Sequence, residues 1–138
     1  MIKVNFYEFE NDVQYKFAVI VAVHRGKWVF CKHKNRNTYE CPGGHREPNE
    51  MIDETAKREL WEETGAKKYN LTSVCAYSVE DESGETFGML YFADIFEFGA
   101  LPPLEIERIE LLDHLPTNWT YPQIQPLLVE QIIKLHLI

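Results

Sequence analysis

The sequence has few cysteines, no long hydrophobic run and no excess of positive charge. Its three cysteines, Cys31, Cys41 and Cys75, are widely spaced and cannot all pair, which is typical of a reducing cytosol and excludes a disulfide scaffold. The longest apolar run, Phe17 to Val23, is far shorter than the ~20 residues of a membrane-spanning helix. The first six residues lack a basic segment followed by an apolar stretch, so we expect no signal peptide. These features predict a cytoplasmic protein without a membrane partner.

Positive charge is scarce, with 14 Lys and Arg against 22 Asp and Glu and a net charge of −8. A chain of this charge is repelled by the nucleic-acid backbone, so we expect no duplex nucleic acid partner. A small phosphorylated ligand remains compatible if a cation mediates the contact. The hydrophobic fraction of 45% is that of a globular protein, and the length lies in the usual range of ~100–200 residues per domain. We therefore predict a single domain over residues 1–138.

Hydrophobic patterns alternate between strand and helix signals along the chain. Strand-like runs occupy residues 16–24, 27–33, 71–80, 86–97 and 106–113, and a charged loop at 81–85 predicts a hairpin. Helical spacing occupies residues 50–64, with Asn49 as the N-cap and Gly65 as the residue that ends the helix, and residues 122–137. Five or six strands with two or more helices predict an α/β or α+β sandwich around a mixed sheet.

The first predicted helix is unusually acidic, because residues 47–63 contain seven acids and two bases. On a helical wheel Glu59, Glu62 and Glu63 share an arc of about 100° that continues the core-facing stripe. Like charges at this spacing, near the negative end of the helix dipole, destabilise a helix unless a cation compensates them. Clustered carboxylates suit Mg²⁺ or Mn²⁺. A solvated acidic face, with Arg58 paired to Glu62, is the alternative explanation.

A glycine turn precedes this helix. The segment Cys41-Pro42-Gly43-Gly44 permits close backbone approach of a ligand or metal, and glycines leading into a helix form a common phosphate-binding arrangement. A glycine turn, a helix and three clustered carboxylates together predict a metal–phosphate site.

The same residues form a long pattern with fixed spacing. The pattern consists of Gly44, a gap of five residues, Glu50, a gap of seven residues, and residues 58–66 with the sequence Arg-Glu-Leu-Trp-Glu-Glu-Thr-Gly-Ala. It resembles the Nudix box. The one departure is Ala66, where the family usually has a larger aliphatic residue. The resemblance implies a Nudix-type α/β/α sandwich around a mixed β-sheet and a hydrolase that cleaves a diphosphate linked to another group.

By matching position, the resemblance assigns roles to the residues of the box. Glu59, Glu62 and Glu63 would hold the metal, Mg²⁺ or Mn²⁺, and the Gly44 carbonyl would be a further ligand. Arg58 would orient a catalytic glutamate. The metal would neutralise phosphate charge and lower the pKa of an attacking water, and one carboxylate would act as general base. Glu62 is the first candidate for this base and Glu105 the second, although Glu105 can also be simply exposed.

The substrate is predicted from residues outside the box. The chain lacks the proline of the ADP-ribose branch and the tyrosine of the dinucleoside-polyphosphate branch, so it resembles the mutator-type branch. That branch converts nucleoside triphosphates, including 8-oxo-dGTP, to the monophosphate and pyrophosphate, a reaction of nucleotide-pool sanitation.

Several side chains are candidates for substrate binding. Lys34 and Arg36 precede the Gly43-Gly44 turn and can reach phosphate oxygens, although ordinary surface cations would look the same. The amide of Asn118 offers a donor and an acceptor to a purine edge, or it caps a turn before Trp119. The aromatic residues that can stack on a base are Trp28, Tyr39, Phe87 and Tyr121.

Other functions remain open at this level. An RNA 5′-triphosphate is an alternative substrate, against which the net charge argues mildly. A nucleotide-sensing module without catalysis is another alternative, as is isomerase chemistry on isoprenoid diphosphates, with Cys41 beside the glycine turn. Cys31 and His33 share a strand face but lack a CxxC or HxxxH partner for zinc. Apolar residues on the last helix are compatible with either a monomer or a homodimer.

Overall fold

The computed structural model describes residues 1–9 and 14–138. In chain order the elements are β1 (Lys3–Tyr7), β2 (Phe17–His24), β3 (Lys27–His33), β4 (Tyr39–Glu40), β5 (Gly43–His45), α1 (Ile52–Thr64), β6 (Ala66–Asp81), β7 (Gly84–Phe98), β8 (Ile106–Leu112) and α2 (Gln125–Lys134). None of the described residues form a helix that is long and apolar enough to cross a membrane.

The strands form one mixed sheet, as predicted. Its order is β1-β6-β7-β2-β3-β4, with β5 paired to β2 and β8 paired to β3. Strands β2 and β7 are parallel, whereas the other pairs are antiparallel. The sheet is therefore built around a central parallel pair with antiparallel additions on each side.

Strand β2 has different partners at its two ends on the side away from β7. Its last residues, Ala22 to His24, pair with β3, whereas Phe17 to Val19 pair with β5. Strands β2 and β3 therefore separate, and the Gly43-Gly44 segment takes the edge that β3 leaves free. This split carries the glycine turn to the middle of the sheet, beside α1.

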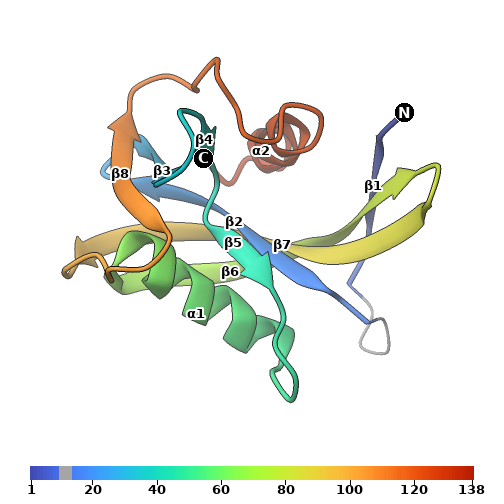
Figure 1. Ribbon diagram of the computed structural model, residues 1–138, viewed down its shortest axis with the longest axis horizontal. Coiled ribbons are helices and arrows are strands. Elements are labelled where there is room, and N and C mark those ends of the chain that lie inside the picture. Colours follow the sequence, from blue (N-terminus) through green and yellow to red (C-terminus); the bar gives the residue numbers. More distant parts are fainter. Residues whose placement is uncertain (10–13) are drawn as a thin grey trace.

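The two helices cover opposite faces of the sheet (Figure 1), and each face has its own core. Alternate residues of β2 divide between them, with Ala18, Ile20 and Ala22 on the α1 side and Val21 on the α2 side. Completely buried residues of α1 (Ala56, Leu60) and α2 (Leu128, Val129, Ile132) fill these cores. The α/β/α layering expected from the family resemblance is thus confirmed.

Element boundaries differ from the predicted ones at several places. Helix α1 begins at Ile52, with Met51 at the N-cap position. Asn49 has a positive φ of 66° and is not the N-cap. Gly65 ends the helix with φ 75°, as predicted. Helix α2 spans only 125–134, because residues 121–124 form a turn before it.

The strands β6 and β7 are longer than predicted because they pair with each other along almost their whole length. The charged loop predicted at 81–85 is shorter in the structure, where Asp81 pairs with Gly84 and the two residues between them form a tight turn. Strands β1 and β5 were not predicted, since each is short and gains its hydrogen bonds from a partner distant in sequence. The two-residue strand β4, directly before the glycine turn, pairs with the nearby β3.

Candidate active site

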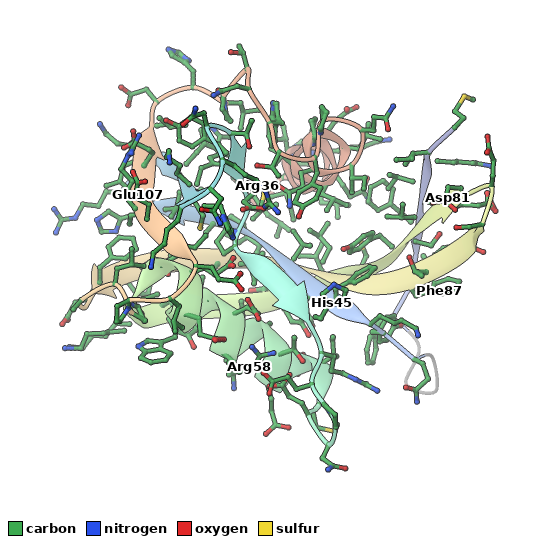
Figure 2. All side chains as sticks on the ribbon, in the orientation of Figure 1. Arg36, His45, Arg58, Asp81, Phe87 and Glu107 are labelled. Atoms are coloured by element: carbon green, nitrogen blue, oxygen red, sulfur yellow. The ribbon has the colours of Figure 1, made fainter. Side chains whose placement is uncertain are left out.

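Arg58 is the hub of the acidic helix surface. Its Nε donates to Glu50 Oε2 at 2.7 Å, and its Nη1 donates to Glu59 Oε1 at 2.7 Å and Glu62 Oε2 at 2.8 Å. Its Nη2 donates to the His45 carbonyl at 2.9 Å, which ties β5 to α1. Figure 2 shows Arg58 on α1 and Arg36 near β4, on opposite sides of β5 in that view. The predicted i,i+4 pair between Arg58 and Glu62 is present.

The glycine turn lies directly against two of the acids. The Gly43 N–H donates to Glu63 Oε1 at 3.0 Å. A Cβ added to Gly44 would lie 2.5 Å from the Glu59 carboxyl carbon, so a larger residue there would displace the Glu59 carboxylate. At Gly43 an added Cβ would collide with the Ala18 carbonyl oxygen. The two glycines thus bring the backbone of the turn into contact with the carboxylates.

The acids of this cluster differ in their electrostatic environment. Burial raises the pKa of Glu63 to about 8, with a smaller contribution from the charge of Glu59 and an opposing one from the Gly43 N–H. Burial also raises the pKa of Glu59 to about 6, although Arg58 opposes the shift. The Arg58 hydrogen bonds instead lower the pKa of Glu50 to about 2. One guanidinium therefore compensates Glu50 well and leaves Glu59 and Glu63 short of positive charge.

These residues suit a divalent cation chemically, although their side chains are not arranged as a ligand set. Within residues 1–9 and 14–138, no three His, Cys, Asp or Glu side chains are grouped so that they can hold a metal ion. Arg58 holds Glu59 and Glu62, and the Gly43 N–H holds Glu63. The uncompensated charge of Glu59 and Glu63 is the feature that fits a hard cation with oxygen ligands. These hydrogen bonds use one oxygen of each carboxylate and leave the second oxygen for a cation.

Glu105 is brought to the acidic cluster by strand pairing. It lies just before β8, and its carbonyl accepts the Lys34 N–H at 3.0 Å. The side chain is 78% exposed and its Oε2 lies 3.8 Å from His33 Nε2. Its charge contributes to the raised pKa values of Glu59 and Glu63. Although exposed, Glu105 faces the same space as the acids of α1.

Two neighbouring cavities adjoin the glycine turn. The first is lined by charged groups from both sides of the site: His33, Arg36, Glu40, Gly43, Gly44, His45, Arg46, Glu47, Pro48, Arg58, Glu59, Glu105 and Tyr121. We call it the charged cavity. The second has a volume of about 280 Å³ and is lined mainly by apolar and aromatic side chains, and we call it the apolar cavity. Glu40, Gly43, Gly44, His45 and Tyr121 belong to both, so the two cavities are adjacent.

The structure distributes the predicted substrate-binding residues unevenly. Arg36 lines the charged cavity, with its Nη1 3.5 Å from Glu40 Oε1. Lys34 is exposed and lines neither cavity. Asn118 also lies outside both cavities, and its Nδ2 donates to the Asn37 carbonyl at 2.9 Å. Arg36 is therefore the better placed of the predicted cations, and the amide of Asn118 supports a turn.

Two residues at the site, Glu40 and Gln125, could not be identified from the sequence. Glu40 lines both cavities, as does His45 beside the glycine turn, and Gln125 lines the apolar cavity. Gln125 is a polar residue that is only 5% exposed at the start of α2. A polar position on an otherwise apolar helix face was the one available signal for it.

The predicted cysteine alternatives receive no geometric support. All three cysteines are buried free thiols. Burial raises the pKa of Cys41, so it does not ionise readily. Cys31 Sγ donates to the Glu63 carbonyl at 3.4 Å, and no third metal-ligating side chain joins Cys31 and His33 in the described part of the chain.

Comparison with known proteins agrees with this geometry. The family model of the NUDIX domain matches residues 13–115. A curated relative from Bacillus subtilis (strain 168), named "Putative 8-oxo-dGTP diphosphatase YtkD", is 39% identical over 80 residues. That alignment covers 58% of this chain and 50% of the relative, so the match spans about half the relative's length.

Solved structures share the fold over nearly the whole chain. A mutant of the Bacillus subtilis pyrophosphohydrolase BsRppH superposes with a TM-score of 0.79 at 25% identity, covering 95% of this chain and 90% of that one. The NUDIX domain of Shewanella oneidensis NrtR, crystallised with ADP ribose, gives a TM-score of 0.66 at 15% identity, with 90% of each chain covered. The second likeness shows the fold alone.

Proposed function

The chain belongs to the NUDIX domain family, and from that premise we propose that it is a hydrolase of phosphoric anhydrides acting on nucleoside triphosphates. The products would be the nucleoside monophosphate and pyrophosphate, and 8-oxo-dGTP is the substrate we would test first. In this proposal residues 1–138 form one catalytic domain. The observation that carries it is the pair of undercompensated acids, Glu59 and Glu63, in contact with the Gly43-Gly44 turn.

A divalent cation, Mg²⁺ or Mn²⁺, would be held by Glu59, Glu62, Glu63 and the Gly44 carbonyl. Bound there, it would neutralise phosphate charge and lower the pKa of the attacking water. Arg36 and Arg46 line the charged cavity and would contact phosphate oxygens. Arg58 would hold the acids in position through its present hydrogen bonds. Glu62 would accept the proton of the attacking water, with Glu105 as the second candidate for this role.

The comparisons support the class of substrate, but they do not identify the residue that acts as general base. The curated relative is named for 8-oxo-dGTP, and BsRppH is titled a pyrophosphohydrolase. Both names fit the cleavage of a phosphoanhydride with release of pyrophosphate.

A 5′-triphosphorylated RNA is the second candidate substrate, and one structural feature favours it. A further cavity is lined by Gln14, Tyr15, Lys16, His45, Arg46, Glu47, Pro48 and Asn49, and it shares four of these residues with the charged cavity. Lys16 and Arg46 give it two cationic side chains. A chain whose 5′-phosphates occupy the charged cavity would have room there for a following nucleotide.

The test is a product assay with Mg²⁺ on 8-oxo-dGTP, the ordinary nucleoside triphosphates, ADP-ribose, a diadenosine polyphosphate and a 5′-triphosphorylated oligonucleotide. We expect monophosphate and pyrophosphate from the triphosphates. Glu62→Gln should lower kcat by about 10²–10⁴, the contribution of a general base, while the circular dichroism spectrum stays unchanged. Glu130→Gln, on the exposed surface of α2, is the matched control and should keep full activity.

Each other outcome has a definite meaning. Full activity of Glu62→Gln with loss in Glu105→Gln would move the base to Glu105. Nucleotide binding without any product from the substrates in the panel would contradict hydrolase activity and favour a nucleotide-sensing module.

A further inference from the structure

The apolar cavity has the size and lining of a site for one planar ring system. Its volume of about 280 Å³ lies near the lower end of small-molecule pockets, which start at roughly 300 Å³. Phe17 and Tyr77 stack across its wall with ring centroids 6.3 Å apart, and Val79 and Ile124 add aliphatic surface. The cavity lies between α2 and the sheet face that α2 covers, and it adjoins the charged cavity at the glycine turn.

One buried amide lies in this apolar lining. Gln125 is 5% exposed, and its Oε1 accepts the Cys41 backbone N–H at 2.8 Å. A backbone N–H can only donate, so the amide cannot flip: the reversed orientation would set NH₂ against N–H. The Oε1 atom is therefore committed to the protein, and Nε2 is the end that remains for a ligand.

The Nε2 group has no hydrogen-bond partner among residues 1–9 and 14–138. In the same part of the chain no fully buried side-chain nitrogen or oxygen lacks a partner, so Nε2 must reach open space. Because Gln125 lines the apolar cavity and is otherwise buried, that space is the cavity. The cavity therefore presents a fixed hydrogen-bond donor.

We propose that Gln125 is a specificity residue that selects a nucleobase with a ring carbonyl over one with an amino group at the same position. This inference rests on the proposed function, because the phosphates must occupy the charged cavity for the base to enter the apolar one. Guanine O6 and uracil or thymine O4 accept hydrogen bonds, whereas the amino groups of adenine N6 and cytosine N4 donate. The Gln125 Nε2 group can therefore donate a hydrogen bond to the carbonyl oxygen of the first group of bases. Against the amino group of the second group, one donor faces another and no hydrogen bond forms.

Other polar side chains in the cavity do not provide this discrimination. Glu40 lies at the junction of the two cavities and is paired with Arg36, which places it nearer the phosphate side. The hydroxyl groups of Thr86 and Tyr121 can rotate to donate or to accept. The His45 ring also lines the cavity, and its nitrogens donate or accept according to the tautomer. Among these side chains, the Gln125 amide is the one whose polarity is fixed by a backbone hydrogen bond.

The sharpest test uses pairs of substrates that differ only at the exocyclic group of the base and in the protonation of the ring nitrogen beside it. Inosine triphosphate has a carbonyl at C6 where ATP has an amino group, and UTP and CTP differ likewise at C4. We expect the wild-type protein to show kcat/KM at least tenfold higher for the carbonyl member of each pair. The products IMP and AMP, bound in the presence of EDTA and followed by calorimetry, should show the same order without catalysis.

Two substitutions separate recognition from folding. In Gln125→Met the donor is lost, and both ratios should fall to within about twofold of one. In Gln125→Glu an ionised carboxylate can still accept the Cys41 N–H while its second oxygen accepts from the ligand, so the preference should reverse toward ATP and CTP. Gln123→Glu introduces the same charge two residues away at an exposed position outside the cavity, and should leave both ratios unchanged. Melting curves confirm that each variant is folded.

The outcomes distinguish this inference from the proposed function. Wild-type protein that hydrolyses triphosphates without a preference, or a folded Gln125→Met variant that retains the wild-type preference, overturns the role of Gln125 and leaves the hydrolase intact. Wild-type protein that hydrolyses none of the four triphosphates contradicts the proposed function. In that case a carbonyl preference in the binding of IMP over AMP would still support the role of Gln125.

Discussion

The carboxylates of α1 and of the loop before it are chemically alike and are made different by their neighbours. Glu50 receives two hydrogen bonds from Arg58 and one from Thr55, and its pKa lies at about 2. Glu63 receives the Gly43 N–H, yet burial raises its pKa to about 8. In the absence of metal, ionised Glu63 therefore costs free energy in the folded protein, and that cost is what a cation would relieve.

This difference predicts how the stability of the metal-free protein depends on pH. A carboxyl group whose pKa is raised from 4.5 to about 8 on folding binds more protons in the folded state between these values. Its stabilising effect is complete below the unfolded pKa and is lost as pH rises toward 8. In EDTA the free energy of unfolding should therefore fall from pH 5 to pH 8, as measured by urea denaturation.

Glu63→Gln should flatten most of this slope, because the glutamine cannot ionise. Mg²⁺ should stabilise the wild-type protein more at pH 8 than at pH 5. A wild-type slope that survives unchanged in Glu63→Gln would contradict the assignment, and the remaining slope would then be traced to Glu59, whose pKa is shifted in the same direction.

The end of helix α1 decides where its last acids lie. Gly65 has φ 75°, and its N–H donates to the Trp61 carbonyl. A Cβ at this position would lie 2.9 Å from the Ala100 carbonyl oxygen. The left-handed residue turns the chain directly into β6, which fixes the last helical turn, with Glu62 and Glu63, against the sheet face that α1 covers.

Gly65→Ala should therefore lower the free energy of unfolding by at least about 1–2 kcal/mol, the cost of a left-handed non-glycine residue. The contact with Ala100 should add to this value. Gly84→Ala is the comparison, because its added Cβ meets nothing within 4 Å although its φ of 141° is also strained. The measurement is chemical denaturation, and equal losses in the two variants would show that the Ala100 contact contributes nothing.

The whole molecule has two cores that share one sheet. Leu60 is completely buried on the α1 side and Leu128 on the α2 side. The acids of α1 depend on the first core and the apolar cavity on the second, and strand β2 contributes residues to both. The two halves of the candidate site are therefore coupled through the sheet.

Leu60→Ala and Leu128→Ala should each cost about 2–5 kcal/mol, the usual effect of removing a buried leucine side chain. Because the cores share β2 and β7, each variant should still unfold in a single transition when followed by both tryptophan fluorescence and circular dichroism. Separate transitions by the two probes would show that the faces of the sheet unfold independently.

The sequence by itself determined the long strands, the acidic helix, its glycine end and the pattern of carboxylates. These features depend on local periodicity and on residues close together in the chain, such as Arg58 with Glu62 and Gly43 with the helix that follows. The resemblance carried by residues 44–66 also predicted the family. The short strands β1 and β5 could not be predicted in the same way, because their hydrogen bonds come from distant partners.

Only the tertiary structure decided what surrounds those carboxylates. The separation of β2 from β3 admits the glycine turn, the approach of β8 brings Glu105 to the acids, and the packing of α2 places the Gln125 amide against Cys41. Each of these contacts joins residues far apart in the chain, where local sequence patterns carry no information. The sequence therefore indicates the chemistry proposed for the phosphate part of the site. Long-range packing forms the apolar cavity, which is proposed to select the nucleobase.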